Sequence, residues 1–208
     1  PEDLKTKKNE EISCDFIETA KLIHENNGIV SVHAGSKSNS IEAITNALSH
    51  KMATKRELVN HIDIYELGKL VDSEDYERIV FPAIDKILPM IICSDNHNIK
   101  KYHLKDNLWI KADPTFEGLK QIIHEPQQRV YIGETPYKLE FLDNHKELFI
   151  DLISITSSSN DQEWFDSVNT IKLNNGLVTI IGNKGNGKSA LADIIGMTSN
   201  ANTSEYSF

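Results

Sequence analysis

Near its C-terminal end the chain reads LVTIIGNKGNGKSALADII, over residues 177–195. The apolar, β-branched run at 177–181 predicts a buried strand, and the apolar spacing at 189–197 predicts a helix. Between them, residues 182–189 match the pattern G-x-x-x-x-G-K-S/T at every fixed position. A strand, a glycine-rich loop and a helix in this order are typical of a loop that binds phosphate.

The residue types in this loop suit a nucleoside triphosphate. Glycines allow the backbone to curl so that successive N–H groups point at phosphate oxygens, and the start of the helix adds partial positive charge. We expect Lys188 to reach the β- and γ-phosphates as the catalytic residue, and the Ser189 hydroxyl to ligate Mg²⁺. The predicted cofactor is ATP with Mg²⁺, and the predicted nucleotide-binding residues are Gly182, Asn183, Lys184, Gly185, Asn186, Gly187, Lys188, Ser189 and Ala190.

Other interpretations of the loop stay open at this point. The same residues also suit a glycine-rich turn that only joins a strand to a helix, and Lys184 and Asn186 suit plain solvated positions. Binding is favoured over hydrolysis, because a P-loop ATPase also needs a second, acidic strand. The 19 residues after Ser189 contain no apolar strand that ends in Asp or Glu. We therefore expect weak or absent ATPase activity from this chain.

Composition sets broad limits. The 208 residues, of which 39% are hydrophobic and 25% charged, are sufficient for one large domain or two small ones. The net charge of −9 argues against a broad basic face for nucleic acid. Two cysteines, Cys14 and Cys93, favour free thiols in a reducing cytoplasm, and no apolar run approaches the roughly 20 residues that cross a bilayer. The first residues show neither a start methionine nor a signal peptide, so we expect a cytoplasmic protein of which this chain is a piece.

Strands and helices alternate through the first 94 residues. The patterns predict strands at 28–35, 62–67 and 90–94, and helices at 10–26, 40–50, 55–59 and 73–88. Ser73 is expected to cap the last helix and Pro82 to bend or split it. This order predicts an α/β fold with a mainly parallel sheet, helices outside it, and chemistry at the carboxyl ends of the strands.

The later part of the chain has a different pattern. It predicts strands at 109–112, 129–133 and 148–155, and a helix at 115–124 that Pro126 stops. A polar connector at 134–145 indicates a domain boundary. We therefore expect two domains, 1–137 and 138–208.

The predicted strand ends carry side chains that can bind metals. His33 ends the first strand, Glu66 lies near the end of the second, and Asp95 and His97 follow the third. The D-x-H spacing puts two ligands on one side of the chain, and imidazole with carboxylate suits Zn, Mn or Fe. A hydrogen-bonded turn explains D-x-H as well, His33 also suits a core histidine, and Glu66 also suits a capping or solvated group. The other histidines, His24 among them, show no partner pattern.

These segments resemble the PHP (polymerase and histidinol phosphatase) domain. Residues 28–35 resemble its G-x-x-x-x-x-H-P/A-G segment, 63–67 are similar to its following gIEv strand, and 93–97 resemble its closing G/C-S-D-x-H motif. Residues 109–119, with Glu125-Pro126 and Arg129-Val130 after them, resemble the junction of TrlF-type proteins, where a PHP domain is fused to an SMC-like ATPase. The phosphate-binding pattern falls where that ATPase begins.

The resemblance implies a partial PHP-type β/α barrel followed by the start of a P-loop ATPase domain. It implies metal roles for His33, Asp95 and His97, with Mn, Zn or Fe as the metal, and gives Glu66 no firm role. The PHP family opens with an H-x-H pair, which this chain lacks, so we expect an incomplete metal site. By the same resemblance, the whole protein cleaves phosphoesters with nucleic acid as a candidate substrate, dimerises through its ATPase part and belongs to bacterial defence.

Two other functions fit the same sequence. One is an ATP-driven mechanical or signalling module whose PHP-type part is a metal-free scaffold. The other is a binding protein that senses nucleotide and docks a partner. Metal content distinguishes the first from a phosphoesterase, and tight ATP binding without phosphatase or ATPase activity would indicate the second.

Overall fold

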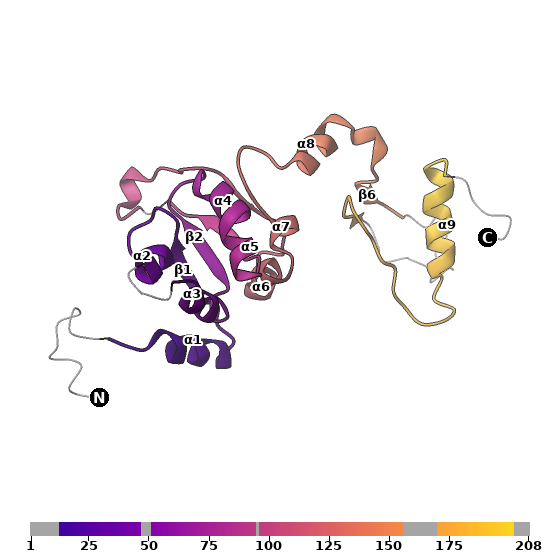
Figure 1. Ribbon diagram of the computed structural model, residues 1–208. Helices are drawn as coiled ribbons and strands as arrows, with labels where there is room; N and C mark the ends of the chain where they lie inside the picture. The colour runs from indigo at the N-terminus through magenta and orange to yellow at the C-terminus, as the bar shows by residue number, and fades with distance from the viewer. Residues whose placement is uncertain (1–12, 47–50, 95, 156–169, 202–208) are drawn as a thin grey trace. The chain divides into compact units, whose positions relative to one another are not determined.

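The computed structural model describes residues 13–46, 51–94, 96–155 and 170–201. The chain forms two compact units, Pro1–Pro136 and Tyr137–Phe208 (Figure 1). Both contain helices and strands, which confirms the predicted α/β class. Within the described residues the strands form one three-stranded sheet and two two-stranded sheets, and no barrel closes. None of the helices in these ranges combines the length and the apolar character that crossing a bilayer requires.

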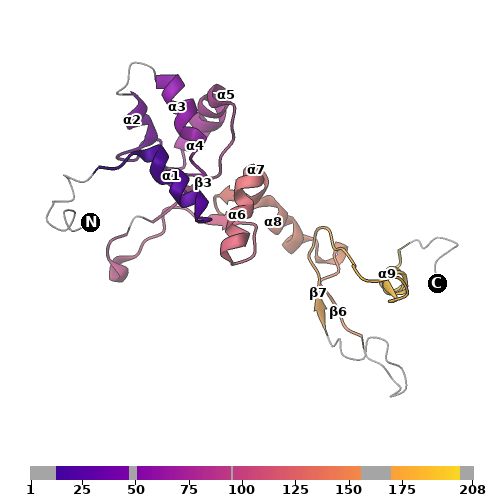
Figure 2. The same ribbon diagram turned by 90° about the horizontal axis from the view of Figure 1, so that it is seen from below.

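A parallel sheet lies at the centre of the first unit. Its strands are β1 (Ser31–Ala34), β2 (Ile64–Leu67) and β3 (Met90–Ile92), paired in that order with both pairs parallel. Figure 1 labels β1 and β2, and Figure 2 labels β3. In this register His33 lies directly beside Glu66. The predicted parallel sheet is therefore confirmed, and its carboxyl edge brings together residues from separate parts of the chain.

Three helices accompany the first two strands: α1 (Phe16–Glu25), α2 (Ile41–Asn46) and α3 (Lys51–Val59). Asp15 caps α1 by accepting a hydrogen bond from the Glu18 backbone N–H at 2.9 Å. The predicted helix at 10–26 ends within one residue of the expected place, before Asn27, which takes a left-handed conformation with φ of 64°. Its predicted start is wrong, because residues 13–15 are not helical and α1 begins at Phe16. α3 begins four residues before the predicted position 55, and residues 47–50 lie outside the described part.

A continuous helical stretch joins β2 to β3. It consists of α4 (Asp72–Asp75), the π-helix η3 (Tyr76–Val80) and α5 (Phe81–Ile84). Pro82 has no N–H, and its ring clashes with the carbonyl four residues earlier, so a regular α turn cannot continue there. The backbone widens instead, and the Phe81 N–H donates to the Tyr76 carbonyl, five residues earlier. The predicted break at Pro82 takes the form of this π turn.

Both predicted ends of this helix, Ser73 and Leu88, are wrong. The helix begins one residue earlier, and Ser73 Oγ donates to the Leu70 carbonyl at 2.7 Å instead of capping the first turn. It ends at Ile84, because Asp85 adopts a left-handed conformation with φ of 54°. Leu88 is apolar because it is buried in the core on the way into β3, not because it continues the helix.

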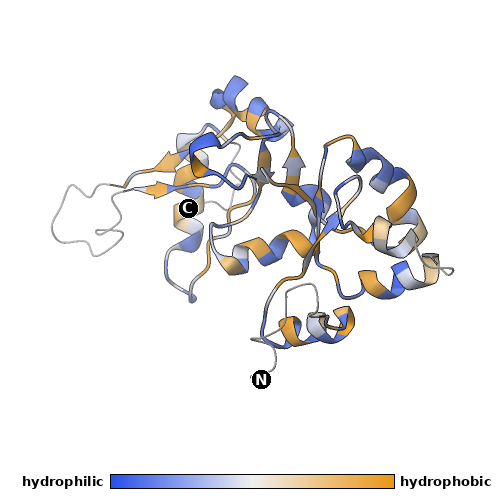
Figure 3. Cartoon of the chain, turned by 90° about the vertical axis from the view of Figure 1, so that its left-hand side faces the viewer, coloured by the Kyte–Doolittle hydropathy of each residue, from blue (hydrophilic) through white to orange (hydrophobic). Residues whose placement is uncertain are grey.

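The core of the first unit is formed by residues of β2 and the surrounding helices. Its buried members are Ala34, Ile41, Val59, Ile62, Tyr65, Leu67, Tyr76, Phe81, Ile84 and Leu88. Tyr65 and Tyr76 meet edge to face with their ring centroids 5.1 Å apart, and both rings pack against Phe81. Figure 3 shows that the helices carry hydrophobic and hydrophilic residues on different parts of their surface. This distribution is typical of helices that bury one face against a core and expose the other to water.

A partly buried carboxylate connects the elements around this core. Glu42, in α2, accepts hydrogen bonds from the Gly35 backbone N–H at 2.9 Å and from the Tyr76 hydroxyl, and it pairs with the Lys55 ammonium at 3.0 Å. Burial, and then the Glu42 carboxylate, raise the pKa of Tyr76, so its hydroxyl stays protonated and keeps donating. Glu42 thereby joins the turn after β1 to α2, α3 and η3.

His24 has a partner that the sequence did not indicate. Its Nε2 lies 2.8 Å from Asp63 Oδ2, and the same oxygen accepts a hydrogen bond from the Val30 N–H at 2.8 Å. Asp63 therefore ties the end of α1 and the approach to β1 to the start of β2. Periodicity could not reveal this contact, because 39 residues separate the two side chains.

The rest of the first unit is a hairpin-like pair of strands with two helices between them: β4 (Leu108–Ile110), α6 (Phe116–His124), α7 (Pro126–Arg129) and β5 (Val130–Ile132), preceded by the 3₁₀ turn Ile99–Lys101. β4 and β5 pair antiparallel. Thr115 caps α6 by accepting the Gly118 N–H at 3.0 Å. The predicted stop at Pro126 is confirmed, and Pro126 also begins α7, where its missing N–H costs nothing.

The second unit contains α8 (Tyr137–Asn144), the 3₁₀ turn Lys146–Leu148, β6 (Leu152–Ile153), β7 (Ile171–Lys172) and α9 (Lys188–Thr198). β6 and β7 pair antiparallel (Figure 2). The predicted helix at 189–197 is confirmed as α9. The predicted strand at 148–155 shrinks to the two residues of β6, because only Leu152 and Ile153 have a strand partner.

The predicted buried strand at 177–181 is wrong. These residues belong to no strand, and Leu177 and Ile181 are 89% and 88% exposed. A strand is stabilised by the backbone groups of a neighbour, and β6 and β7 pair with each other rather than with this segment. Apolar character alone therefore did not make it a strand.

We expect Tyr65→Phe to raise the free energy of unfolding by roughly 1 kcal/mol, because an orphan buried polar group is costly. The Tyr65 side chain is fully buried, and its hydroxyl has no hydrogen-bond partner among the described residues. Tyr76→Phe is the matched control, since it removes the same atom but breaks contacts with Glu42 and Gly35. It should lower the free energy of unfolding by about 1–3 kcal/mol. Urea denaturation measures both, and equal losses in the two variants would contradict this interpretation.

Candidate functional site

The phosphate-binding pattern forms a curled loop that leads directly into α9. Gly185 and Gly187 have φ of 90° and 73°, in the left-handed region that favours glycine. The Lys188 ammonium folds back over the loop and donates to the Asn183 carbonyl at 2.8 Å. Within the loop, the Asn186 N–H also points to the Asn183 carbonyl, at 3.3 Å. The backbone of the segment thus curls back on itself, and the Lys188 side chain lies against the Asn183 carbonyl.

The same loop is open to a ligand. Asn183, Lys184, Asn186 and Ser189 are exposed, whereas Lys188 is half-buried. α9 begins at Lys188 and runs for 11 residues, so its free N–H groups and partial positive charge point to this place. Gly185 has open space around it, so its conformation rather than crowding requires glycine. This arrangement can bind phosphate oxygens through backbone N–H groups and one ammonium.

A second cluster lies at the carboxyl edge of the parallel sheet. Glu66 accepts a hydrogen bond from the Lys37 ammonium, whose side chain is only 8% exposed. His33, beside Glu66 in the register, donates from Nδ1 to the Ser38 carbonyl at 3.0 Å. Glu66 is therefore neither a cap nor a solvated group, since it forms a partly buried ion pair with a residue from the loop after β1.

The predicted metal ligands are not gathered by the described residues. His33 lies at the sheet edge, His97 is exposed, and Asp95 lies outside the described part of the chain. Among residues 13–46, 51–94, 96–155 and 170–201, no three His, Cys, Asp or Glu side chains are placed to hold a metal ion. The positive charge beside Glu66 comes from Lys37, and a protonated amine has no lone pair for a metal. The metal site predicted from His33, Asp95 and His97 therefore stays a prediction.

Cys93 belongs to the same edge. Burial raises the pKa of its thiol, and the Glu66 carboxylate raises it further, while the Lys37 ammonium acts in the opposite direction. The thiol is consequently protonated and weakly nucleophilic at neutral pH. This environment does not suit a catalytic cysteine.

The turn between β1 and α2 is held by carboxylates. Gly35, with φ of 64°, donates its N–H to Glu42, and Ser36 donates both its N–H and its hydroxyl to Asp72 Oδ2, at 2.9 and 2.7 Å. A Cβ on Gly35 would lie 2.5 Å from Asp72 Oδ2, so only glycine fits. The turn thereby fixes the backbone that carries Lys37.

Sequence reasoning missed Lys37, Glu42 and Asp72. The loop at 35–40 is polar and follows a strand, which indicates a site but not which side chain folds inward. Asp72 lies in the first turn of a helix, where an acidic residue is ordinarily explained by the helix dipole. The contacts that reveal these residues join positions 29 to 36 residues apart, except for those of Glu42 with Gly35 and Lys55.

No model of a known protein family matches the chain, and neither a curated protein nor a solved structure is significantly similar to it. Function is therefore inferred from the loop at 182–189 and from the sheet edge around Lys37 and Glu66.

Alkylation of Cys93 tests the electrostatics of the sheet edge. We expect iodoacetamide at pH 8 to modify exposed Cys14 faster than Cys93, whose pKa is raised. Glu66→Gln removes a nearby negative charge, so it should lower the pKa of Cys93 and speed its labelling. Lys37→Met removes the positive charge and should slow it. Peptide mass spectrometry measures both rates, and acceleration in both variants would indicate local opening instead.

Proposed function

We propose that the chain binds the triphosphate of ATP, together with Mg²⁺, through the loop at 182–189. The observation that carries this proposal is the combination of two left-handed glycines with an inward-folded lysine at the start of a helix. A turn that merely joined two elements would need neither the lysine contact nor the second left-handed glycine. The loop is also exposed apart from Gly187 and Lys188, so a ligand can reach it from the solvent.

Lys188, Ser189 and the backbone of the loop have distinct roles in this proposal, and the Lys184 side chain has none. Lys188 exchanges its contact with the Asn183 carbonyl for the β- and γ-phosphate oxygens, because a charged oxygen is a stronger acceptor than a carbonyl. The backbone N–H groups of the loop and of Ala190 hold the phosphates. The exposed Ser189 hydroxyl is the ligand that the chain offers to Mg²⁺, which neutralises phosphate charge when bound.

Lys188→Ala should weaken Mg-ATP binding about tenfold or more, because it removes the only charged donor at a fixed position of the motif. Lys184→Ala is the matched control, since it removes the same charge from an exposed, variable position of the same loop. It should change the affinity less than about twofold. Isothermal titration calorimetry measures both. Equal losses in the two variants, or none in Lys188→Ala, would refute the assignment.

The resemblance to TrlF-type proteins extends this proposal to the whole protein. In that form, the ATPase part dimerises, and the PHP-type part cleaves phosphoesters, with nucleic acid as the substrate, using Mn, Zn or Fe held by His33, Asp95 and His97. The partial PHP-type barrel, the cytoplasmic location and the role in bacterial defence belong to the same proposal. The weak or absent ATPase activity proposed for this chain is measured by ATP turnover, with Lys188→Ala as its control.

A second candidate function is favoured by the Lys37–Glu66 pair. A buried ammonium beside Glu66 repels a metal cation and supplies the charge that a carboxylate at this edge requires. The first unit then acts as a metal-free scaffold for a nucleotide-driven module. This candidate rests on the partly buried ion pair between Lys37 and Glu66.

Metal analysis separates the two candidates. We expect chain purified and dialysed with Mn²⁺ or Zn²⁺ to retain far less than one metal ion per molecule, with no hydrolysis of p-nitrophenyl phosphate. Inductively coupled plasma mass spectrometry gives the metal content. One ion per chain that is lost in both His33→Ala and Asp95→Ala, but kept in His103→Ala, would instead support the phosphoesterase. His103 is the matched control because it is an exposed histidine outside the motifs.

A further inference from the structure

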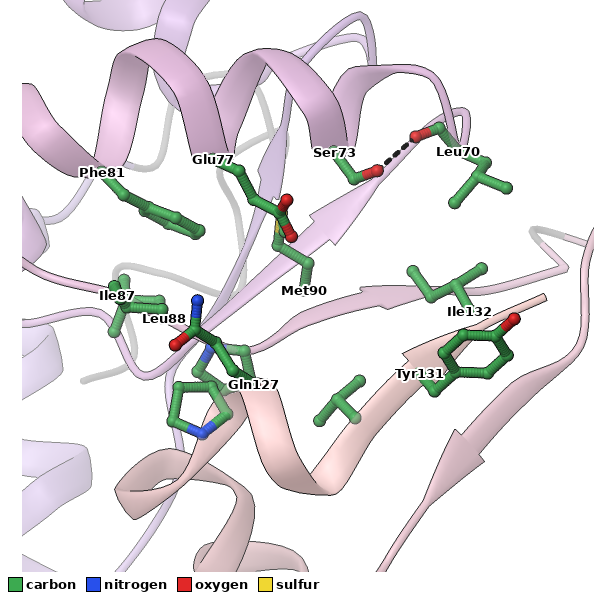
Figure 4. A pocket seen from close by; sticks show the side chains of 13 residues that line it. Leu70, Ser73, Glu77, Phe81, Ile87, Leu88, Met90, Gln127, Tyr131 and Ile132 are labelled. Atoms are coloured by element: carbon green, nitrogen blue, oxygen red, sulfur yellow. Dashed lines mark hydrogen bonds between the residues drawn. The ribbon is translucent and has the colours of Figure 1, made fainter. Parts of the chain in front are cut away.

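The first unit contains an open apolar groove that the proposed function does not use (Figure 4). It has a volume of about 430 Å³ and lies between the helical stretch η3–α5 on one side and α7 with β5 on the other. Most of the residues that line it are apolar, among them Phe81, Leu88, Met90, Val130 and Ile132. A hollow of this size and character is typical of a binding site.

Large apolar side chains remain in water along its rim. Ile87 and Tyr131 are each 44% exposed, and Leu70 is 38% exposed. Isolated exposed apolar residues are common, but these three line one groove and are continuous with its apolar floor. A contiguous apolar patch of this kind indicates an interaction surface.

The groove is longer than one small molecule. Two neighbouring hollows, of about 370 and 400 Å³, both share Ile87 and Gln127 with it. One continues along α5 past Pro82 and Asp85, and the other continues along the end of α6 and α7. An elongated, open channel of this form suits a peptide segment that places successive side chains in it.

The charges along the channel are mainly negative. Glu77 points into the groove in Figure 4, and Asp85 and Glu125 line the neighbouring hollows. Glu125 is paired with Arg129 at 2.8 Å. The ammonium of Lys86, the lysine in these walls, is engaged with the carbonyls of Val59 and Ile62 at 2.9 and 3.4 Å. Glu77 and Asp85 therefore give the channel an acidic rim.

We propose that this channel docks a segment of a partner protein that carries apolar side chains flanked by lysine or arginine. The apolar side chains cover the floor, and the basic side chains meet Glu77 and Asp85 at the rim. Tyr76 is buried in the core, whereas the next residue, Glu77, faces the channel. A partner segment suits the channel better than a second copy of the chain, because a symmetric contact of the channel with itself would bring like charges together.

Fluorescence anisotropy with the whole chain tests this proposal. The probe is a labelled amphipathic peptide of leucine and lysine, about 14 residues long, and its matched control has glutamate in place of every lysine. We expect the lysine peptide to bind and the glutamate peptide to bind at least tenfold more weakly, because like charges at the rim repel it.

Variants then locate the binding. Glu77→Lys with Asp85→Lys should lower the affinity for the lysine peptide about tenfold. The control is Glu57→Lys with Glu74→Lys, which makes the same change of net charge at exposed positions outside the channel, and should change the affinity less than about twofold. Ile87→Ala, a shortening of a half-exposed side chain, should weaken binding about threefold.

Several results would overturn the proposal. Equal weakening by the two charge-reversed pairs would show non-specific attraction to an acidic protein. Equal binding of the lysine and glutamate peptides would show that Glu77 and Asp85 do not contribute to recognition. Sedimentation that reveals a dimer of the chain, abolished by Glu77→Lys with Asp85→Lys, would assign the channel to a second copy. Circular dichroism of each variant confirms that folding is retained, and the Ile87→Ala result stays decisive if a double variant fails to fold.

Discussion

The carboxylate of Glu42 is the contact on which the arrangement of the first unit depends. Three donors from three different elements converge on it, namely the Gly35 N–H, the Tyr76 hydroxyl and the Lys55 ammonium. A carboxylate withdrawn from water is tolerated only when it is paired and hydrogen-bonded, so removing any donor penalises the others. By fixing the turn after β1, Glu42 also determines where Lys37 can reach. The position of the Lys37–Glu66 ion pair therefore depends on the hydrogen bonds and the ion pair of Glu42.

The sites of the two units differ in how far apart in the sequence their residues lie. In the first, the parallel pairing of three strands brings distant residues to one edge, and the chemistry there is electrostatic: Lys37 neutralises Glu66, and both influence Cys93. In the second, the phosphate-binding loop is a local structure, because its glycines, its lysine and the start of α9 lie within a few residues. A local site keeps its shape even where the surrounding sheet is small.

This difference explains what the sequence could predict. Pattern and spacing were sufficient for the strands of the parallel sheet, for the end of α1 and for the start of α9, because the local sequence determines each of these elements. They failed at 177–181, where apolar side chains suggested a strand that has no partner, and at Leu88, which is apolar because of tertiary burial. The Lys37–Glu66 pair was also unpredictable, since its residues are 29 positions apart and Lys37 lies in a loop outside any periodic pattern.

The exposed segment at 177–181 has a consequence for the handling of this protein. It is uncharged, rich in β-branched residues and free of proline and glycine, which are the features of sequences that stack into cross-β fibrils. At high concentration, copies of this segment can pair with one another in place of a native neighbour. Lys184 and Lys188 follow shortly after it and oppose such stacking by repulsion, as charged flanking residues do in other aggregation-prone sequences. A bound polyanion that neutralised these lysines would remove that protection unless it also ordered the segment.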